Sequence, residues 1–129
     1  MNLLLDTAAF LWLCSGGQQL SATAAAALVD PANTPGVSAV TAWEIALKHA
    51  KGKLKLPTPP AAWFPAMIRH HRLDLLPIEA ATAIASTSLP PIHADPFDRL
   101  LIATAIEMQI RLVTPDRVMH TYPNIQALW

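Results

Sequence analysis

Short apolar runs alternate with longer segments of helical periodicity along this chain. The runs read as strands and occupy residues 3–6, 36–38, 73–76, 111–114 and 125–129. The longer segments carry apolar residues at helical spacing, or are rich in alanine, and occupy residues 7–14, 22–29, 41–49, 60–72, 79–86 and 96–109. Proline or glycine punctuates many of the junctions. This alternation favours an α/β fold in which helices cover both faces of a mostly parallel sheet of four to five strands.

Local side-chain signals refine where two of the helices begin. Asp95 followed by Pro96 is typical of a helix that begins with a side-chain cap and a proline in its first position. Thr41 and Glu44 have the spacing of a capping box, which places a second helix start at residue 41.

The composition excludes several classes of protein. With 129 residues, 53% of them apolar and 14% charged, residues 1–129 are expected to form a single domain with a substantial core. The formal net charge is zero, so affinity for a polyanion needs a local basic patch. Cys14 is the only cysteine, which excludes an internal disulfide. No apolar run is long enough for a membrane span and no basic leader precedes the first one, so we expect a cytoplasmic protein without membrane contacts.

Four acidic residues are attached to the most hydrophobic segments. Asp6 and Asp116 follow predicted strands, whereas Asp98 lies in the first turn of a helix, on the face that carries Leu101. Glu44 lies inside an apolar helix. Because sites in parallel sheets form outside the carboxyl ends of the strands, we expect these side chains to converge on one cleft. Buried carboxylates repel one another, and a hard divalent cation with oxygen ligands would supply the missing charge.

Each acid also has a purely structural interpretation. Asp6 and Asp116 could cap the segments that follow them, and a carboxylate at position 98 is favoured by the helix macrodipole. Glu44 could pair with Lys48 one helical turn later. The metal-site hypothesis therefore depends on the joint pattern and not on any one residue.

Four segments of the sequence resemble the PIN domain family and, within it, the VapC-like toxin ribonucleases of type II toxin–antitoxin systems. They are residues 3–7, 38–46, 93–103 and 112–116, in the order found in the family. The sequence Asp-Pro-Phe-Asp-Arg at residues 95–99 is the most specific of these matches. The resemblance implies a three-layer α/β/α sandwich around a mostly parallel sheet.

The resemblance also implies a set of functional residues and partners. The catalytic acids would be Asp6, Glu44, Asp98 and Asp116. Asp6 and Asp98 are the leading metal ligands, with Glu44 and Asp116 as further candidates. The supporting residues would be Thr114, Asp95 and Arg99, with Asp95 acting mainly as a helix cap. The expected cofactor is Mg²⁺, with Mn²⁺ as a substitute, for an endoribonuclease that hydrolyses RNA. The expected partners are a VapB-like antitoxin, in a toxin–antitoxin hetero-oligomer, and a second copy in a homodimer.

The residues that would contact substrate or partners are less clearly marked. Two basic stretches could bind phosphates or form ordinary solvated surface: Lys48, Lys51, Lys53 and Lys55, and residues 69–72. Neither His93 nor the His70–His71 pair has the spacing of a zinc site. The aromatic residues suit the core or a subunit interface, and Leu11–Trp12 and Trp63–Phe64 are candidate surfaces for an antitoxin or a second copy.

Two other functions remain open at the level of sequence. A catalytically silent module could use the acidic cleft to hold a basic peptide. A phosphoryl-transfer enzyme could use Asp6 as its nucleophile, although such phosphatases need a second aspartate where this chain has Ala8. Receiver-like chemistry needs a lysine near the end of the chain, and no lysine follows Lys55.

Overall fold

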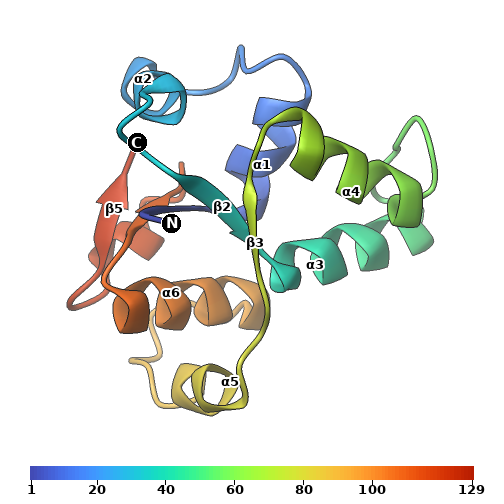
Figure 1. Ribbon diagram of the computed structural model, residues 1–129. Helices are drawn as coiled ribbons and strands as arrows, with labels where there is room; N and C mark the ends of the chain where they lie inside the picture. Colours follow the sequence, from blue (N-terminus) through green and yellow to red (C-terminus); the bar gives the residue numbers. More distant parts are fainter.

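Strands and helices alternate along the chain as the sequence predicts. The computed structural model describes residues 1–129 and contains five strands and six α-helices (Figure 1). The strands are β1 (Leu3–Leu5), β2 (Pro35–Ser38), β3 (Asp74–Leu76), β4 (Arg111–Val113) and β5 (Gln126–Leu128). The helices are α1 (Thr7–Cys14), α2 (Ala22–Val29), α3 (Ala39–Ala50), α4 (Pro60–His70), α5 (Ala80–Ser86) and α6 (Pro96–Met108), with a 3₁₀ turn η1 (Met119–Thr121). None of the helices has the length and apolar character needed to cross a membrane.

The sheet has the strand order β3-β2-β1-β4-β5, and every pairing in it is parallel. The central strand β1 pairs Leu4 with Gly36 of β2 on one side and with Leu112 of β4 on the other. The chain runs outward from β1 to β3 and then returns to the other side for β4 and β5. This reversal puts a topological switch point between β1 and β4, where open α/β sheets form their binding crevices.

Alternating side chains on the sheet divide the core into two layers. Leu3 and Leu5 pack on one face and Leu4 on the other. The first face is covered by α1, α2 and α4, and the second by α6, with α5 packed outside α6 (Figure 1). This arrangement is the three-layer α/β/α sandwich that the sequence predicts. It directs the carboxyl ends of β1, β2 and β4 toward a single edge.

The predicted capping box at Thr41 and Glu44 is wrong. Helix α3 begins two residues earlier, at Ala39, because Ser38 caps it by accepting a hydrogen bond from the Val40 N–H. Thr41 and Glu44 are instead buried side chains whose polar atoms lie within hydrogen-bond distance of the Thr7 hydroxyl. Glu44 therefore does not cap the helix, and its carboxylate lines a cleft instead.

Candidate active site

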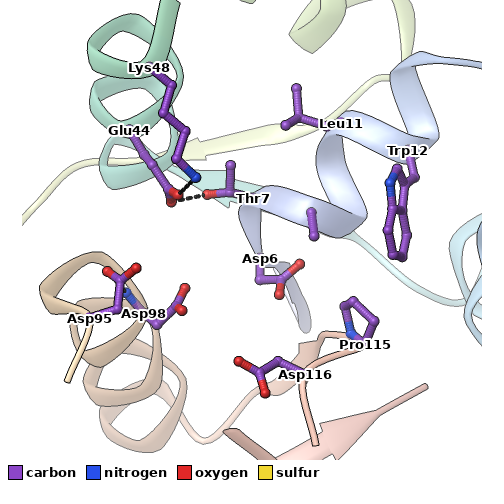
Figure 2. A pocket seen from close by; sticks show the side chains of 11 residues that line it. Asp6, Thr7, Leu11, Trp12, Glu44, Lys48, Asp95, Asp98, Pro115 and Asp116 are labelled. Atoms are coloured by element: carbon purple, nitrogen blue, oxygen red, sulfur yellow. Dashed lines mark hydrogen bonds and ion pairs between the residues drawn. The ribbon is translucent and has the colours of Figure 1, made fainter. Parts of the chain in front are cut away.

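An acidic cleft opens at the carboxyl edge of the sheet, beside the switch point. Its volume is about 400 Å³. Five carboxylates line it, from Asp6, Glu44, Asp95, Asp98 and Asp116 (Figure 2). The only basic side chain in its lining is that of Lys48. Five of the nine acidic residues of the chain therefore meet in one cleft with one ammonium group among them.

Asp6 lies at the floor of the cleft, between β1 and α1. Its Oδ1 accepts the Ala9 N–H at 2.7 Å and so caps α1, and its Oδ2 accepts the Thr114 hydroxyl at 2.6 Å. Thr114 follows β4, so this bond joins the ends of the two strands at the switch point. Burial raises the pKa of Asp6 to about 6, against the opposing effect of these hydrogen bonds. The cap predicted at Asp6 is confirmed, and it coexists with a position in the cleft.

Asp98 lies across the cleft from Asp6, in the first turn of α6. Asp95 caps this helix as predicted, with its Oδ1 accepting the N–H groups of Phe97 and Asp98. Burial, followed by repulsion from Asp95, raises the pKa of Asp98 to about 7. Near neutral pH this carboxyl group is therefore poised between its two protonation states.

Glu44 reaches the cleft from α3 and is 4% exposed. Its Oε1 accepts the Thr7 hydroxyl at 2.7 Å and its Oε2 accepts a hydrogen bond from the Lys48 ammonium at 2.5 Å (Figure 2). The i,i+4 pair that the sequence allows is thus present, at the rim of an acidic cleft. The hydrogen bond to Glu44 raises the pKa of Lys48 and keeps the ammonium charged.

Asp116 contributes from the loop after β4. Its Oδ1 accepts the Val118 N–H at 3.0 Å, so Asp116 caps the turn that follows. This is the structural role that the sequence allowed for it. Its Oδ2 lies 3.0 Å from Nε2 of His93, and the same nitrogen lies 3.1 Å from Oδ2 of Asp98. The sequence assigns no role to His93, although it opens the segment 93–103 that resembles the PIN family and lies two residues before the Asp95 cap.

Comparisons with known proteins identify the family of this chain. The PIN domain model matches residues 3–124. The chain is 35% identical to Ribonuclease VapC22 of Mycobacterium tuberculosis over 131 residues, covering 99% of this chain and 98% of that protein. The chain belongs to the PIN domain family. The resemblance read from the four sequence segments is thereby confirmed.

Solved structures related to this PIN protein support the fold independently. One is the VapBC2 complex of Rickettsia felis bound to a DNA fragment from its promoter, with a TM-score of 0.73, 17% identity and coverage of 98% of this chain and 97% of that chain. Another is the DNA-bound VapBC complex of Salmonella typhimurium, with a TM-score of 0.71, 19% identity and coverage of 98% and 96%. At these identities the likeness concerns the arrangement of helices and strands.

Arg99 of this PIN protein does not reach the cleft. Its guanidinium donates to the backbone carbonyls of Ser86, Leu89, Pro90 and His93 at 2.9–3.2 Å. It also lies 3.4 Å from the Tyr122 hydroxyl. Through these bonds Arg99 fixes the loop between α5 and α6.

The structure shows which of the predicted basic and aromatic residues lie at the cleft. Of the two basic stretches, only Lys48 lines the acidic cleft. Trp63 and Phe64 are 8% and 7% exposed and pack on Phe10, so they belong mainly to the core, and Trp63 also lines the apolar groove beside the cleft. Trp12 is partly exposed and lines both the cleft and an adjacent apolar groove.

Proposed function

We propose that this PIN protein is a metal-dependent endoribonuclease, the VapC-like toxin of a toxin–antitoxin pair. The observation that carries the proposal is the convergence of five carboxylates, from four separate parts of the chain, on a cleft with a single ammonium group. A relative that is 35% identical to this chain is named Ribonuclease VapC22, and RNA cleavage is the activity proposed here. A cluster of this kind is costly without a cation and suits hydrolysis of an anionic substrate.

The donor set fits a hard divalent ion such as Mg²⁺ or Mn²⁺. The groups that face the cleft are carboxylate oxygens, which these ions prefer, and no thiolate is among them. Asp98 is the leading ligand, because its Oδ1 accepts no hydrogen bond from the protein, and Asp6 is the second. Glu44 and Asp116 are the further candidates, and their oxygens, like those of Asp6, already accept hydrogen bonds from protein donors.

The chain's own groups divide the work of phosphodiester hydrolysis. A bound ion would supply positive charge to the phosphate and lower the pKa of a water. Lys48, held at the rim by Glu44, binds a phosphate oxygen of the RNA. The oxygen of a water forms a bond to phosphorus and passes a proton to a carboxylate of the cleft, while the bond from phosphorus to the leaving oxygen breaks and that oxygen takes up a proton from solvent.

Cleavage of RNA in Mg²⁺ or Mn²⁺ tests the assignment. Asp6→Asn and Asp98→Asn should each lower the rate by about 10²-fold or more, and chelation of the ion should abolish cleavage. Asp74→Asn is the matched control, because Asp74 is an exposed carboxylate on β3, outside the cleft. If the folded cleft variants cut RNA as fast as wild type, the site is wrongly assigned.

The role of Lys48 has its own matched pair. Lys48→Met and Lys53→Met remove the same charge, but Lys53 is exposed outside the cleft. Only Lys48→Met should weaken RNA binding and cleavage. Equal effects of the two substitutions would mean that these lysines attract RNA through their combined charge and not through a specific contact of Lys48.

We further propose that the cognate antitoxin covers this cleft. The solved relatives include toxin–antitoxin complexes from Rickettsia felis and Klebsiella pneumoniae. An apolar groove continues from the cleft past Leu11 and Trp12 to Leu54 and Leu56. An antitoxin segment in this groove could place a basic side chain among the acids, where five carboxylates face one ammonium.

Co-purification with the cognate antitoxin tests this arrangement. Trp12→Ala should weaken the complex measurably, whereas Ile84→Ala, at a 70% exposed side chain on α5, should leave it unchanged. The alternative of a catalytically silent module makes a different prediction. Calorimetry should then detect no Mn²⁺ binding to the wild-type protein, and Asp98→Asn should cause no loss.

A further inference from the structure

We propose that His93 is a positioning residue of the acidic site, whose Nε2–H group holds the carboxylates of Asp98 and Asp116 in a fixed arrangement. The inference rests on the proposed function, since it gives His93 a role in the same site. His93 joins two parts of the chain that otherwise repel each other: the first turn of α6 and the loop after β4.

The hydrogen bonds around the ring determine which nitrogen carries the proton. The Asp95 N–H lies 3.1 Å from Nδ1 of His93. A backbone N–H can only donate, so Nδ1 accepts and has no proton of its own. The proton of the neutral ring is then on Nε2, which lies 3.1 Å from Asp98 Oδ2 and 3.0 Å from Asp116 Oδ2. Asp116 Oδ2 accepts the hydrogen bond from Nε2–H, and Asp98 Oδ2 lies close enough for the same N–H group to offset part of the repulsion between the two carboxylates.

The same tautomer argues against His93 as a direct metal ligand. Ligand atoms of His93, Asp98 and Asp116 all lie within 4.8 Å of one another, so distance alone would permit a shared ion. A neutral imidazole binds metal through an unprotonated nitrogen, and here that nitrogen is Nδ1, which faces the Asp95 N–H. Coordination through Nε2 would require loss of its proton or of the Asp95 bond. His93 therefore acts on an ion only through the carboxylates that it holds.

This arrangement decides which carboxylate oxygens remain free. Asp116 is held at both oxygens, by Val118 N–H and by His93. Asp98 has a contact with His93 at Oδ2 alone, and its Oδ1 accepts no hydrogen bond from the protein. Loss of the Nε2–H group would let both side chains rotate and would restore their mutual repulsion.

The backbone of His93 is itself fixed from two directions. Its N–H donates to the Tyr122 hydroxyl at 2.7 Å, and its carbonyl accepts from the Arg99 guanidinium at 3.2 Å. Arg99 follows Asp98 directly on α6, so the helix that carries the carboxylate also anchors the loop that carries the imidazole. Arg99 thus supports the site by way of His93.

Mn²⁺ binding in the absence of RNA tests the proposal. His93→Leu removes the donor and should weaken Mn²⁺ affinity by about 10–100-fold, the usual effect of losing a group that orients a ligand. His93→Gln offers an amide N–H at similar reach and should recover most of the affinity. Tyr122→Phe, which removes the acceptor of the His93 N–H, should have a smaller effect in the same direction. His49→Gln, on α3 outside the cleft, is the matched control and should bind as wild type.

Two spectroscopic measurements do not depend on RNA cleavage. Long-range ¹H–¹⁵N spectra of the metal-free protein should show the proton of His93 on Nε2, and the opposite tautomer would overturn the proposal. Pulsed electron paramagnetic resonance of bound Mn²⁺ should lack a directly coordinated imidazole nitrogen. A coordinated nitrogen that disappears in His93→Leu would make His93 a ligand and would also overturn it.

The outcomes separate this inference from the proposed function. If wild type binds Mn²⁺ in an Asp98-dependent manner and His93→Leu binds it equally well, only the role of His93 is wrong. If wild type binds no Mn²⁺, the proposed function fails, and the tautomer still reports whether His93 bridges the two carboxylates.

Discussion

At the scale of single residues, Asp98 shows most clearly the conflict between burial and charge. Its pKa of about 7 lies well above the ordinary value of 3.8, mainly because of burial and secondly because of Asp95. The folded protein therefore holds a proton that the unfolded chain has already released between about pH 4 and about pH 7. The ionised carboxylate is retained at a cost to stability, as is common at sites that bind cations.

Asp98→Asn is expected to stabilise the metal-free protein at about pH 8 and to have little effect at about pH 4. Because the pKa of Asp98 is raised in the folded state, the free energy of unfolding of the wild-type protein falls as the pH increases from about 4 to about 7. Above that range the loss is complete. Thermal unfolding across this pH range measures it, with Asp74→Asn, at an exposed carboxylate, as the control. A lower unfolding temperature for Asp98→Asn at the higher pH would contradict the assigned direction.

Mn²⁺ affinity is expected to rise with pH up to about 7 and then to level off. Below their pKa values of about 6 and about 7, Asp6 and Asp98 hold protons that the ion must displace. Each displaced proton lowers the apparent affinity by up to about tenfold per pH unit. Titration calorimetry in buffers of different ionisation enthalpy counts the protons released. A pH-independent affinity would exclude these two carboxylates as ligands.

At the scale of elements, the site is assembled by the ends of β1, β4 and two helices. Asp6 and Asp95 cap α1 and α6 through one carboxylate oxygen each, which explains how a structural and a chemical role share one residue. Thr114 joins β4 to this network, since its hydroxyl donates to Asp6 and accepts the Asp116 N–H. The geometry of the cleft thus depends on bonds between strand ends.

Thr114→Val is expected to destabilise the metal-free protein by about 1–3 kcal/mol, because it keeps the shape and leaves the buried Asp6 carboxylate and the Asp116 N–H without their partner. The hydroxyl favours ionised Asp6, so the loss should be larger at about pH 8 than at about pH 5. Urea unfolding measures both values. Thr114→Ser keeps the hydroxyl and should show a cost that is independent of pH; a similar pH dependence in both variants would contradict this account.

Local patterns predicted the elements well and their ends less well. Helix α4 stops at His70 and not at residue 72, where Arg72 adopts a positive φ of 52°. The error at α3 has a similar origin, because Ser38, Thr41 and Glu44 offer competing starts and only packing chooses among them. Burial of Thr41 against Thr7 excludes the capping geometry.

At the scale of the whole molecule, large apolar side chains remain exposed in the isolated chain. They include Val29 at 81% and Trp43 at 54% exposure. Trp43 packs edge-on against Phe97 beside the acidic cleft. Surfaces of this kind are commonly covered by partners.

A homodimer is therefore expected for the isolated protein. Light scattering at micromolar concentration should give twice the chain mass of 13.9 kDa. Addition of the antitoxin should increase the mass further into a hetero-oligomer. A monomer under the same conditions would contradict the first expectation without affecting the second.

The sequence by itself determined the alternation of strands and helices, the layered α/β class and the attachment of four acids to the ends of apolar segments. These features are local, because periodicity and caps depend on neighbours within a few residues. Only the tertiary structure decided that Lys48 alone of the basic residues enters the cleft, that Arg99 acts on a loop, and that His93 lies between two carboxylates. Such relations depend on the order β2-β1-β4 and on distances across the sheet, and residues that are far apart along the chain leave no periodic signal of their meeting.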